Sequence, residues 1–160
     1  SRLCAHGGTF VVAMDSDPAC TELNFRRCRE QGMGLVHPLT IDLVNPTPAR
    51  GFAGVERDSL MQRGPADLVL ALAVIHHLAI SNNVPLPQLA SFFAARAKWL
   101  VIEFVPKSDS QVKRLLSSRK DIFPNYTREG FEAAFLEQFN IHKAESVRDS
   151  ERMLYLMEAR

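Results

Sequence analysis

Runs of apolar residues alternate with polar, helix-forming stretches along this chain. The runs are rich in aliphatic and β-branched residues, which favour buried strands. They predict strands near residues 9–14, 36–41, 67–73 and 99–105. Helices are predicted over residues 18–31, 88–97 and 109–118, and a further helix begins after Thr127. Strands that alternate with helices are typical of an α/β protein built on a mostly parallel, doubly wound sheet.

The end of the chain breaks this alternation. Residues 140–147 and 152–159 both have strand-like patterns, and only residues 148–151 separate them. A parallel return needs a crossover of about a dozen residues or more, so this connection requires antiparallel pairing. We therefore expect one domain spanning residues 1–160, with a doubly wound sheet that closes in an antiparallel hairpin.

The run over residues 67–75 is apolar at almost every position, which favours a strand buried on both faces. It is too short to cross a bilayer, which takes about 20 apolar residues. His76 and His77 follow it, where open α/β sheets bind their ligands. The alternative interpretation is that both histidines only complete the strand and find partners at its end.

Several polar residues next to the predicted elements have a structural interpretation. Asp17 and Pro18 suit the start of a helix, whereas Asp15 ends a strand, where a carboxylate can accept the hydroxyls of a ribose. Residues 108–111 (SDSQ) match a capping box in which Ser108 and Gln111 satisfy backbone donors. The basic residues that follow are interpreted as a solvated face rather than a phosphate site: Lys113, Arg114, Arg119 and Lys120.

Composition narrows the function classes. The formal net charge is +1, so no strong field indicates a nucleic-acid or membrane-surface partner. Cys4, Cys20 and Cys28 have no CxxC spacing, which disfavours a disulfide framework and a zinc site, and no metal is expected. Residues 1–8 lack the apolar segment of a signal peptide. We expect a reducing, cytoplasmic setting, and the lack of an initiator Met suggests residues upstream of Ser1.

Four motifs together resemble the class I S-adenosylmethionine-dependent methyltransferases, and the resemblance covers nearly the whole chain. Residues 10–18 (FVVAMDSDP) resemble the second strand of that family, residues 39–43 (LTIDL) the third and residues 67–78 (DLVLALAVIHHL) the fourth. The closing hairpin resembles the reversed seventh strand. Residues 102–107 (IEFVPK) and the segment through Tyr126 are similar to a bacterial branch that includes nodulation-associated methyltransferases.

The resemblance implies roles for individual residues. Asp15 would bind the cofactor ribose, and Asp42 with the backbone amide of Leu43 would meet the adenine. Ser16 and Ala73 are implied as further cofactor-binding residues. His76 and His77 are the candidates for a catalytic base, because the motif places them near the reactive methyl group and the ordinary pKa of histidine is near neutral. Glu103, inside a predicted strand, is a weaker candidate.

The sequence departs from the family in one respect: it lacks the first strand and the glycine-rich loop. Gly7 and Gly8 precede the second strand and come too late to supply that loop. The missing strand would lie between the second and fourth, so its absence leaves backbone groups unpaired. We expect this segment alone to be inactive, to bind S-adenosylmethionine weakly, and to self-associate or be partly disordered.

The predicted function is S-adenosylmethionine-dependent methyl transfer to a small-molecule acceptor that the sequence does not identify. Two alternatives stay open: a non-catalytic binding domain with the methyltransferase fold, and a dinucleotide-dependent oxidoreductase. The missing glycine-rich loop favours the first alternative. The closing hairpin and the paired histidines disfavour the second. An RNA methyltransferase is disfavoured because the chain has no basic patch interleaved with aromatic residues.

Overall fold

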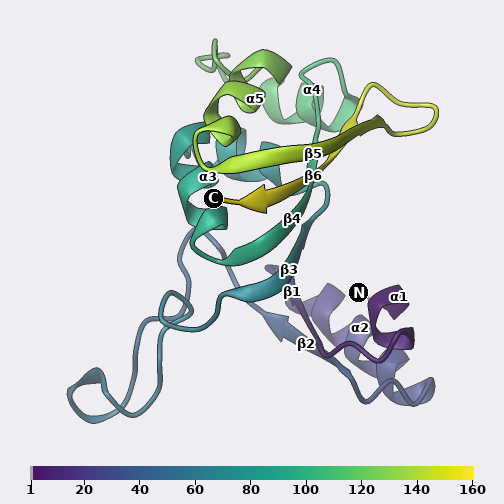
Figure 1. Cartoon of the computed structure of the whole chain (residues 1–160), viewed down its shortest axis with the longest axis vertical. Coiled ribbons are helices and arrows are strands. Elements are labelled where there is room, and N and C mark those ends of the chain that lie inside the picture. The colour runs from purple at the N-terminus through teal and green to yellow at the C-terminus, as the bar shows by residue number, and fades with distance from the viewer. Residues whose placement is uncertain (1) are drawn as a thin grey trace. The chain divides into compact units, whose positions relative to one another are not determined.

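The computed structural model describes residues 2–160 and divides the chain into two compact units. Unit 1 ends at Arg63, and unit 2 comprises Gly64–Arg160. Unit 1 contains α1 (Arg2–His6), β1 (Val11–Asp15), α2 (Pro18–Glu30), β2 (Val36–Thr40) and the short 3₁₀ helix η1 (Phe52–Gly54). Unit 2 contains β3 (Ala66–Ala71), the π-helix η2 (His77–Ser81), α3 (Leu86–Ala94), β4 (Ala97–Phe104), α4 (Ser110–Leu116), α5 (Arg128–Leu136), β5 (Phe139–Ser146) and β6 (Met153–Ala159) (Figure 1). A single domain over residues 1–160 stays a prediction.

Unit 1 is built on two parallel strands. β1 pairs with β2 in a register that sets Asp15 opposite Thr40. The connection between them is α2, which begins where Asp17 accepts a hydrogen bond from the amide of Ala19 at 2.8 Å. Pro18 occupies the first turn, where a missing N–H costs no helical hydrogen bond. The predicted cap at Asp17 and Pro18 is confirmed.

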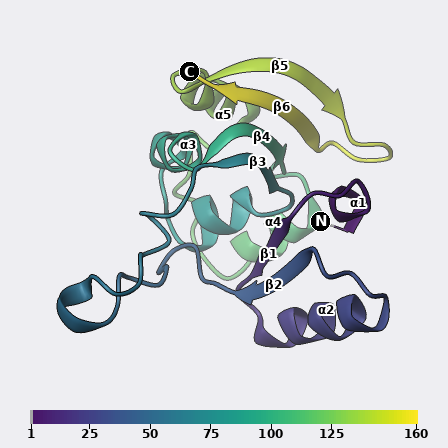
Figure 2. The ribbon, with the colours of Figure 1, turned by 60° about the horizontal axis from the view of Figure 1, so that its bottom comes forward.

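Unit 2 holds a four-stranded sheet in the order β3-β4-β6-β5 (Figure 2). β3 and β4 run parallel, and η2 and α3 form the crossover between them. β6 pairs antiparallel with both β4 and β5, so the last strand of the chain lies inside the sheet rather than at its edge. The predicted antiparallel pairing of residues 140–147 with 152–159 is confirmed. The chain is a mixed α/β protein.

The core of unit 2 is dominated by aromatic side chains. Phe131 on α5 lies 4.3 Å from Phe135 and 5.2 Å from Phe104 on β4, measured between ring centroids. Tyr155 on β6 completes the cluster at 5.1 Å from Phe131. These rings are almost fully buried, so α5 is attached to the sheet by a large apolar contact. Leu136, the last residue of α5, is by contrast 43% exposed.

Two helix starts differ from the predictions. The capping box at residues 108–111 is wrong: Asp109 caps α4 by accepting from the amide of Gln111 at 2.8 Å, and the Ser108 hydroxyl bonds to Glu151 instead. A carboxylate is the stronger acceptor, which explains the choice. α3 begins at Leu86 and ends at Ala94, not over residues 88–97. Pro87 fits its first turn, and Ala97 already belongs to β4.

The predicted burial of β3 on both faces is wrong for this chain. Leu68, Leu70 and Leu72 are 44%, 39% and 53% exposed, and they occupy alternate positions, so they lie on the same side of the chain. Among residues 2–160, β4 is the one strand that pairs with β3. β1 is similarly exposed and has β2 as its one described partner. Both strands thus keep an apolar surface and an edge that is unpaired among the described residues.

We expect the 160-residue chain to self-associate through β3, because an unpaired apolar strand edge recruits other chains. Sedimentation velocity should show an average mass that rises with protein concentration. Leu70→Lys should reduce this rise by placing a charge on the exposed strand. Leu136→Lys is the matched control, since Leu136 is equally exposed but lies on α5. Equal effects of the two substitutions, or a monomeric parent chain, would contradict the prediction.

Candidate functional site

Two acidic residues of unit 1, Asp15 and Asp42, lie at the carboxyl ends of its two strands. The amide of Ile41 donates to the carbonyl of Asp15 at 2.8 Å, which holds the ends of β1 and β2 together. One carboxylate oxygen of Asp15 accepts from the amide of Asp17 at 2.9 Å, and one of Asp42 accepts from the amide of Val44 at 2.9 Å. Both side chains are exposed. Each carboxylate is therefore oriented by its own loop and has a second oxygen that can accept a hydroxyl or an amine.

Ser16 and Leu43 occupy the positions directly after Asp15 and Asp42. The structure therefore brings together, at one end of a two-stranded sheet, the unit 1 residues that the sequence assigned to a cofactor. Asp17 is separate from them in role. Its pKa is lowered chiefly by the hydrogen bond from the Ala19 amide, as expected for a helix cap.

In unit 2, the turn after β3 is held by a buried carboxylate. Ala73 has a left-handed backbone with φ 51°, which is uncommon for a residue with a Cβ atom. Its amide donates to Oε2 of Glu103 at 2.7 Å, from the neighbouring strand β4. Glu103 is 8% exposed, so its burial in mid-strand has a structural explanation. The same bond occupies the Ala73 amide, which leaves the Ala73 carbonyl as the backbone group open to a ligand.

Arg152 links this carboxylate to a second one. Its Nη1 donates to Oε1 of Glu103 at 3.2 Å, and its Nε donates to Oδ2 of Asp109 at 2.8 Å. The hydrogen bond from Arg152 is the largest cause that lowers the pKa of Asp109. The three side chains are between 11% and 24% exposed. Because two donors hold the Glu103 carboxylate, Glu103 is a poor candidate for a base. The same bonds favour a role in positioning the turn at Ala73.

The two histidines have different environments. His76 is 2% exposed, and its Nδ1 has no hydrogen-bond partner among the described residues. Its ring lies 4.2 Å from the ring of His77, centroid to centroid. Burial lowers the pKa of His76 to about 4, with a further contribution from His77 and Arg152. A buried, neutral His76 is poorly placed to exchange protons with an acceptor, whereas His77 is exposed.

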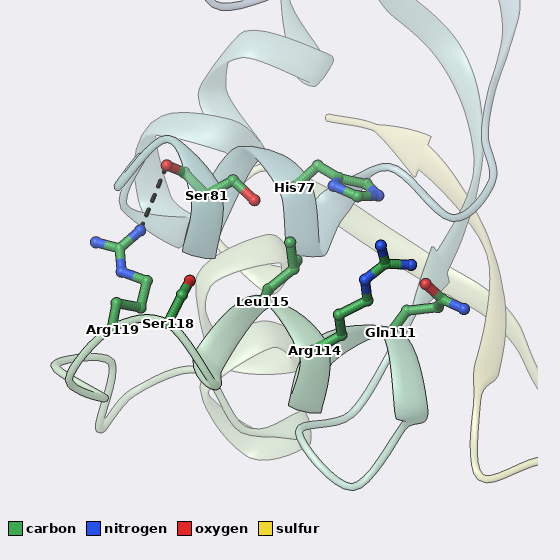
Figure 3. A pocket seen from close by; sticks show the side chains of 7 residues that line it. All are labelled: His77, Ser81, Gln111, Arg114, Leu115, Ser118 and Arg119. Carbon is green, nitrogen blue, oxygen red and sulfur yellow. Dashed lines mark hydrogen bonds between the residues drawn. The ribbon is translucent and has the colours of Figure 1, made fainter.

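His77 begins η2, a π-helix that continues to Ser81. The His77 carbonyl accepts two bonds from Asn82, one from the backbone amide at 3.1 Å and one from the side-chain amide at 2.9 Å. π-helical turns are rare and often occur at functional sites. Here the turn presents His77 to a cavity of about 500 Å³ (Figure 3). The cavity is lined by His77, Ser81, Gln111, Arg114, Leu115, Ser118 and Arg119.

Sequence reasoning missed several of these residues. Arg152 lies 43 positions after Asp109 and 49 positions after Glu103 in the chain. No local sequence pattern predicts contacts over such separations. Arg114 and Arg119 belong to the basic run for which the sequence predicts a solvated face. The solvated-face interpretation is wrong for Arg119, which is half-buried and donates to the carbonyl of Ile80 at 2.5 Å. The prediction for Lys113 and Lys120 agrees with their exposure.

Over the described part of the chain, no group of three or more His, Cys, Asp or Glu residues could hold a metal ion. Nor is any of the helices described here long and apolar enough to cross a membrane. The predicted site residues fall in two sets: Asp15, Ser16, Asp42 and Leu43 in unit 1, and Ala73, His76 and His77 in unit 2. Their roles stay predictions.

Arg152 should contribute strongly to stability, because its removal leaves two largely buried carboxylates without their cation. We expect Arg152→Met to lower the free energy of unfolding by about 3 kcal/mol. Arg148→Met is the control, since Arg148 pairs with Asp149 in a fully exposed loop, and it should cost less than about 1 kcal/mol. Urea denaturation measures both. If Arg152→Met lowers the free energy of unfolding no more than Arg148→Met does, the Arg152 network does not stabilise the fold.

The lowered pKa of His76 predicts a pH dependence of stability. As the pH falls from the ordinary histidine pKa of 6.5 toward about 4, the unfolded chain binds a proton that the folded chain does not. The free energy of unfolding therefore falls over this window and is fully retained above it. Between neutral pH and about pH 5, the parent chain should lose ~2 kcal/mol more than His76→Leu.

The control for this measurement is His77→Leu, which removes an exposed histidine next in sequence and should keep the pH dependence of the parent. Urea denaturation at several pH values gives the three curves. Parallel curves for the parent and His76→Leu would show that His76 is not held neutral in the fold.

Comparison with known proteins relates the chain to one nodulation protein. It is 37% identical over 153 residues to the nodulation protein NoeA of Rhizobium meliloti (strain 1021), a match that covers 96% of this chain and 32% of NoeA. The chain thus spans about a third of the length of this relative. No family model matches the chain.

Among solved structures, the fold is shared by WbdD. A co-crystal structure of WbdD with the kinase inhibitor LY294002 superimposes with a TM-score of 0.62 at 13% identity, over 96% of this chain and 32% of that one. A structure of WbdD described as a bifunctional kinase-methyltransferase gives a TM-score of 0.60 at 14% identity, over 96% and 31%. At such identities the likeness concerns the fold. The predicted similarity to nodulation-associated proteins is confirmed by NoeA, and the chain shares its fold with a protein described as a kinase-methyltransferase.

Proposed function

We propose that the chain forms part of an S-adenosylmethionine-dependent methyltransferase that acts on a small-molecule acceptor. The observation that carries the proposal is the strand order of unit 2, in which the reversed closing strand β6 lies between β4 and β5. This reversed strand is the feature by which the resembled family differs from nucleotide-binding dehydrogenases. Because the chain spans about a third of NoeA, the activity belongs to the whole protein.

In this proposal the unit 1 residues bind the nucleoside of the cofactor. Asp15 accepts the ribose hydroxyls, with Ser16 beside it, and Asp42 with the Leu43 amide meets the adenine. The support is that Asp15 ends β1, that Asp42 comes just after the adjacent parallel strand β2, and that each carboxylate is held by one backbone amide. An oriented carboxylate loses less side-chain entropy when it binds a hydroxyl. Ala73 enters the proposal through its carbonyl, since Glu103 occupies its amide.

The bound cofactor would supply an electrophilic methyl group on its sulfonium. The protein then chiefly orients the acceptor, and positioning supplies much of the rate. A base is needed when the acceptor must lose a proton, and His77 is the better candidate because it is exposed at a cavity. His76, buried beside it, would set the position of the His77 ring rather than take the proton.

A non-catalytic role is the second candidate function. It is favoured by the burial of His76 and by the engagement of both Glu103 and the Ala73 amide, which leave fewer groups for chemistry. Release of S-adenosylhomocysteine by the whole protein with its acceptor would contradict it. The dinucleotide-dependent oxidoreductase receives no support from the antiparallel β6. A cytoplasmic setting, without membrane or nucleic-acid partners, belongs to the same proposal.

The proposal predicts separate effects for two neighbouring aspartates. Asp15→Ala in the whole protein should weaken S-adenosylmethionine binding by about 1.5–3 kcal/mol, the range for a hydrogen bond to a charged group. Asp17→Ala should instead cost about 1 kcal/mol of stability through the lost cap, and leave the affinity nearly unchanged. Calorimetric titration and thermal unfolding of both variants make the comparison. Unchanged affinity in Asp15→Ala would remove Asp15 from the cofactor site.

A further inference from the structure

The cavity between η2 and α4 is cationic and contains no acid. Its lining consists of two arginines, one histidine, one glutamine, two serines and a single apolar residue, Leu115. All seven belong to unit 2. The nearest carboxylate along α4 is Asp109, which caps the helix and is bound to Arg152. No lining residue neutralises the arginines, so the cavity carries an excess of positive charge.

The two arginines of the cavity differ in their bonding. Arg119 is engaged: it donates to the carbonyl of Ile80 at 2.5 Å and to Oδ1 of Asn83 at 2.6 Å, and it stacks on Phe123. The guanidinium of Arg114 has neither an ion pair nor a hydrogen bond among residues 2–160. Arg119 is thus part of the wall, and Arg114 is a donor with its hydrogen-bonding capacity free.

Two further groups lie on the same side of the cavity as Arg114. Figure 3 shows the Arg114 guanidinium reaching from α4 toward η2, with the Gln111 amide beside it and the His77 ring across from it. Gln111 lies three positions before Arg114, so both side chains share one face of α4. No side-chain hydrogen bond of Gln111 or His77 occurs in the described residues. Three polar side chains able to donate therefore converge, and none of them has a side-chain hydrogen bond among the described residues.

We propose that this cavity binds a small molecule through an oxyanion, a carboxylate or a phosphate, with Arg114 as the principal ligand and Gln111 and His77 as supporting donors. A guanidinium presents parallel N–H groups that match both oxyanions in a bidentate fashion. A volume of about 500 Å³ suits a small-molecule ligand, with room beyond the oxyanion for the rest of it. Assigning this ligand as the methyl acceptor rests on the proposed function, whereas anion binding does not.

The test uses the 160-residue chain without S-adenosylmethionine. Inorganic phosphate and acetate are titrated separately at constant ionic strength, and ¹H–¹⁵N spectra report shifts at Gln111, Arg114 and His77. Arg114→Gln should weaken binding of the preferred anion at least about tenfold, the loss expected when a charged hydrogen bond is removed. Lys113→Gln is the matched control: it removes an exposed base from the adjacent position of α4, outside the cavity lining, and should change binding less than about twofold.

The outcomes separate the possibilities. Saturable shifts with phosphate alone identify a phosphate site, and those with acetate alone a carboxylate site. An equal loss in Arg114→Gln and Lys113→Gln would show diffuse surface attraction and overturn the proposal, as would the absence of saturable shifts with either anion. Anion binding by this chain, with no S-adenosylmethionine binding by the whole protein, would leave this site in place and remove the proposed function, so the two failures are distinguishable.

Discussion

The ionic chain from Glu103 through Arg152 to Asp109 determines how unit 2 is arranged around its candidate residues. Glu103 fixes the turn after β3 through the Ala73 amide, and Asp109 caps α4. Arg152, directly before the last strand β6, holds both carboxylates. One cation thereby connects the last strand, the turn that leads to the histidines and the helix that carries Arg114. These three charged side chains are largely buried. A hairpin paired in another register would leave the two carboxylates without Arg152, so alternative registers are less stable.

The elements of the fold could be predicted wherever a local pattern decides them. The hairpin at the end of the chain follows from two strand-like runs with a short connection, and the cap at Asp17 from a carboxylate before a proline. The start of α4 was wrong because Ser108 and Asp109 are adjacent acceptors, and their surroundings decide between them: Glu151 takes the Ser108 hydroxyl. The predicted burial of β3 was wrong because burial depends on the strands and helices that pack against it. The sequence of the strand itself carries no information about these neighbours.

The site was predictable to the extent that residues directly follow strands. Asp15 and the two histidines were identified in this way, since parallel strands end at a common edge, whereas Asp42 was identified through the resemblance to the methyltransferase family. The sequence could not distinguish His76 from His77, because adjacent residues share every local property, and the packing of η2 alone buries one and exposes the other. The same limit applies to Arg114 and Arg119, five positions apart in one basic run. Arg119 meets the carbonyls of Ile80 and Ser81, the Asn83 side chain and the Phe123 ring, and these are distant contacts that the run itself does not contain.

The bonds of Arg119 to the end of η2 have a consequence for any molecule that enters the cavity. They tie the two walls together at one end, so the spacing between the π-helix and α4 is set before a ligand arrives. Binding to a preorganised cavity of this kind loses less conformational entropy than binding to two helices that must first be ordered, which favours a higher affinity. It also limits which ligands fit, since a wider group would have to break three contacts of one guanidinium at once. Selectivity by size would thus come from an arginine that never touches the ligand's charge.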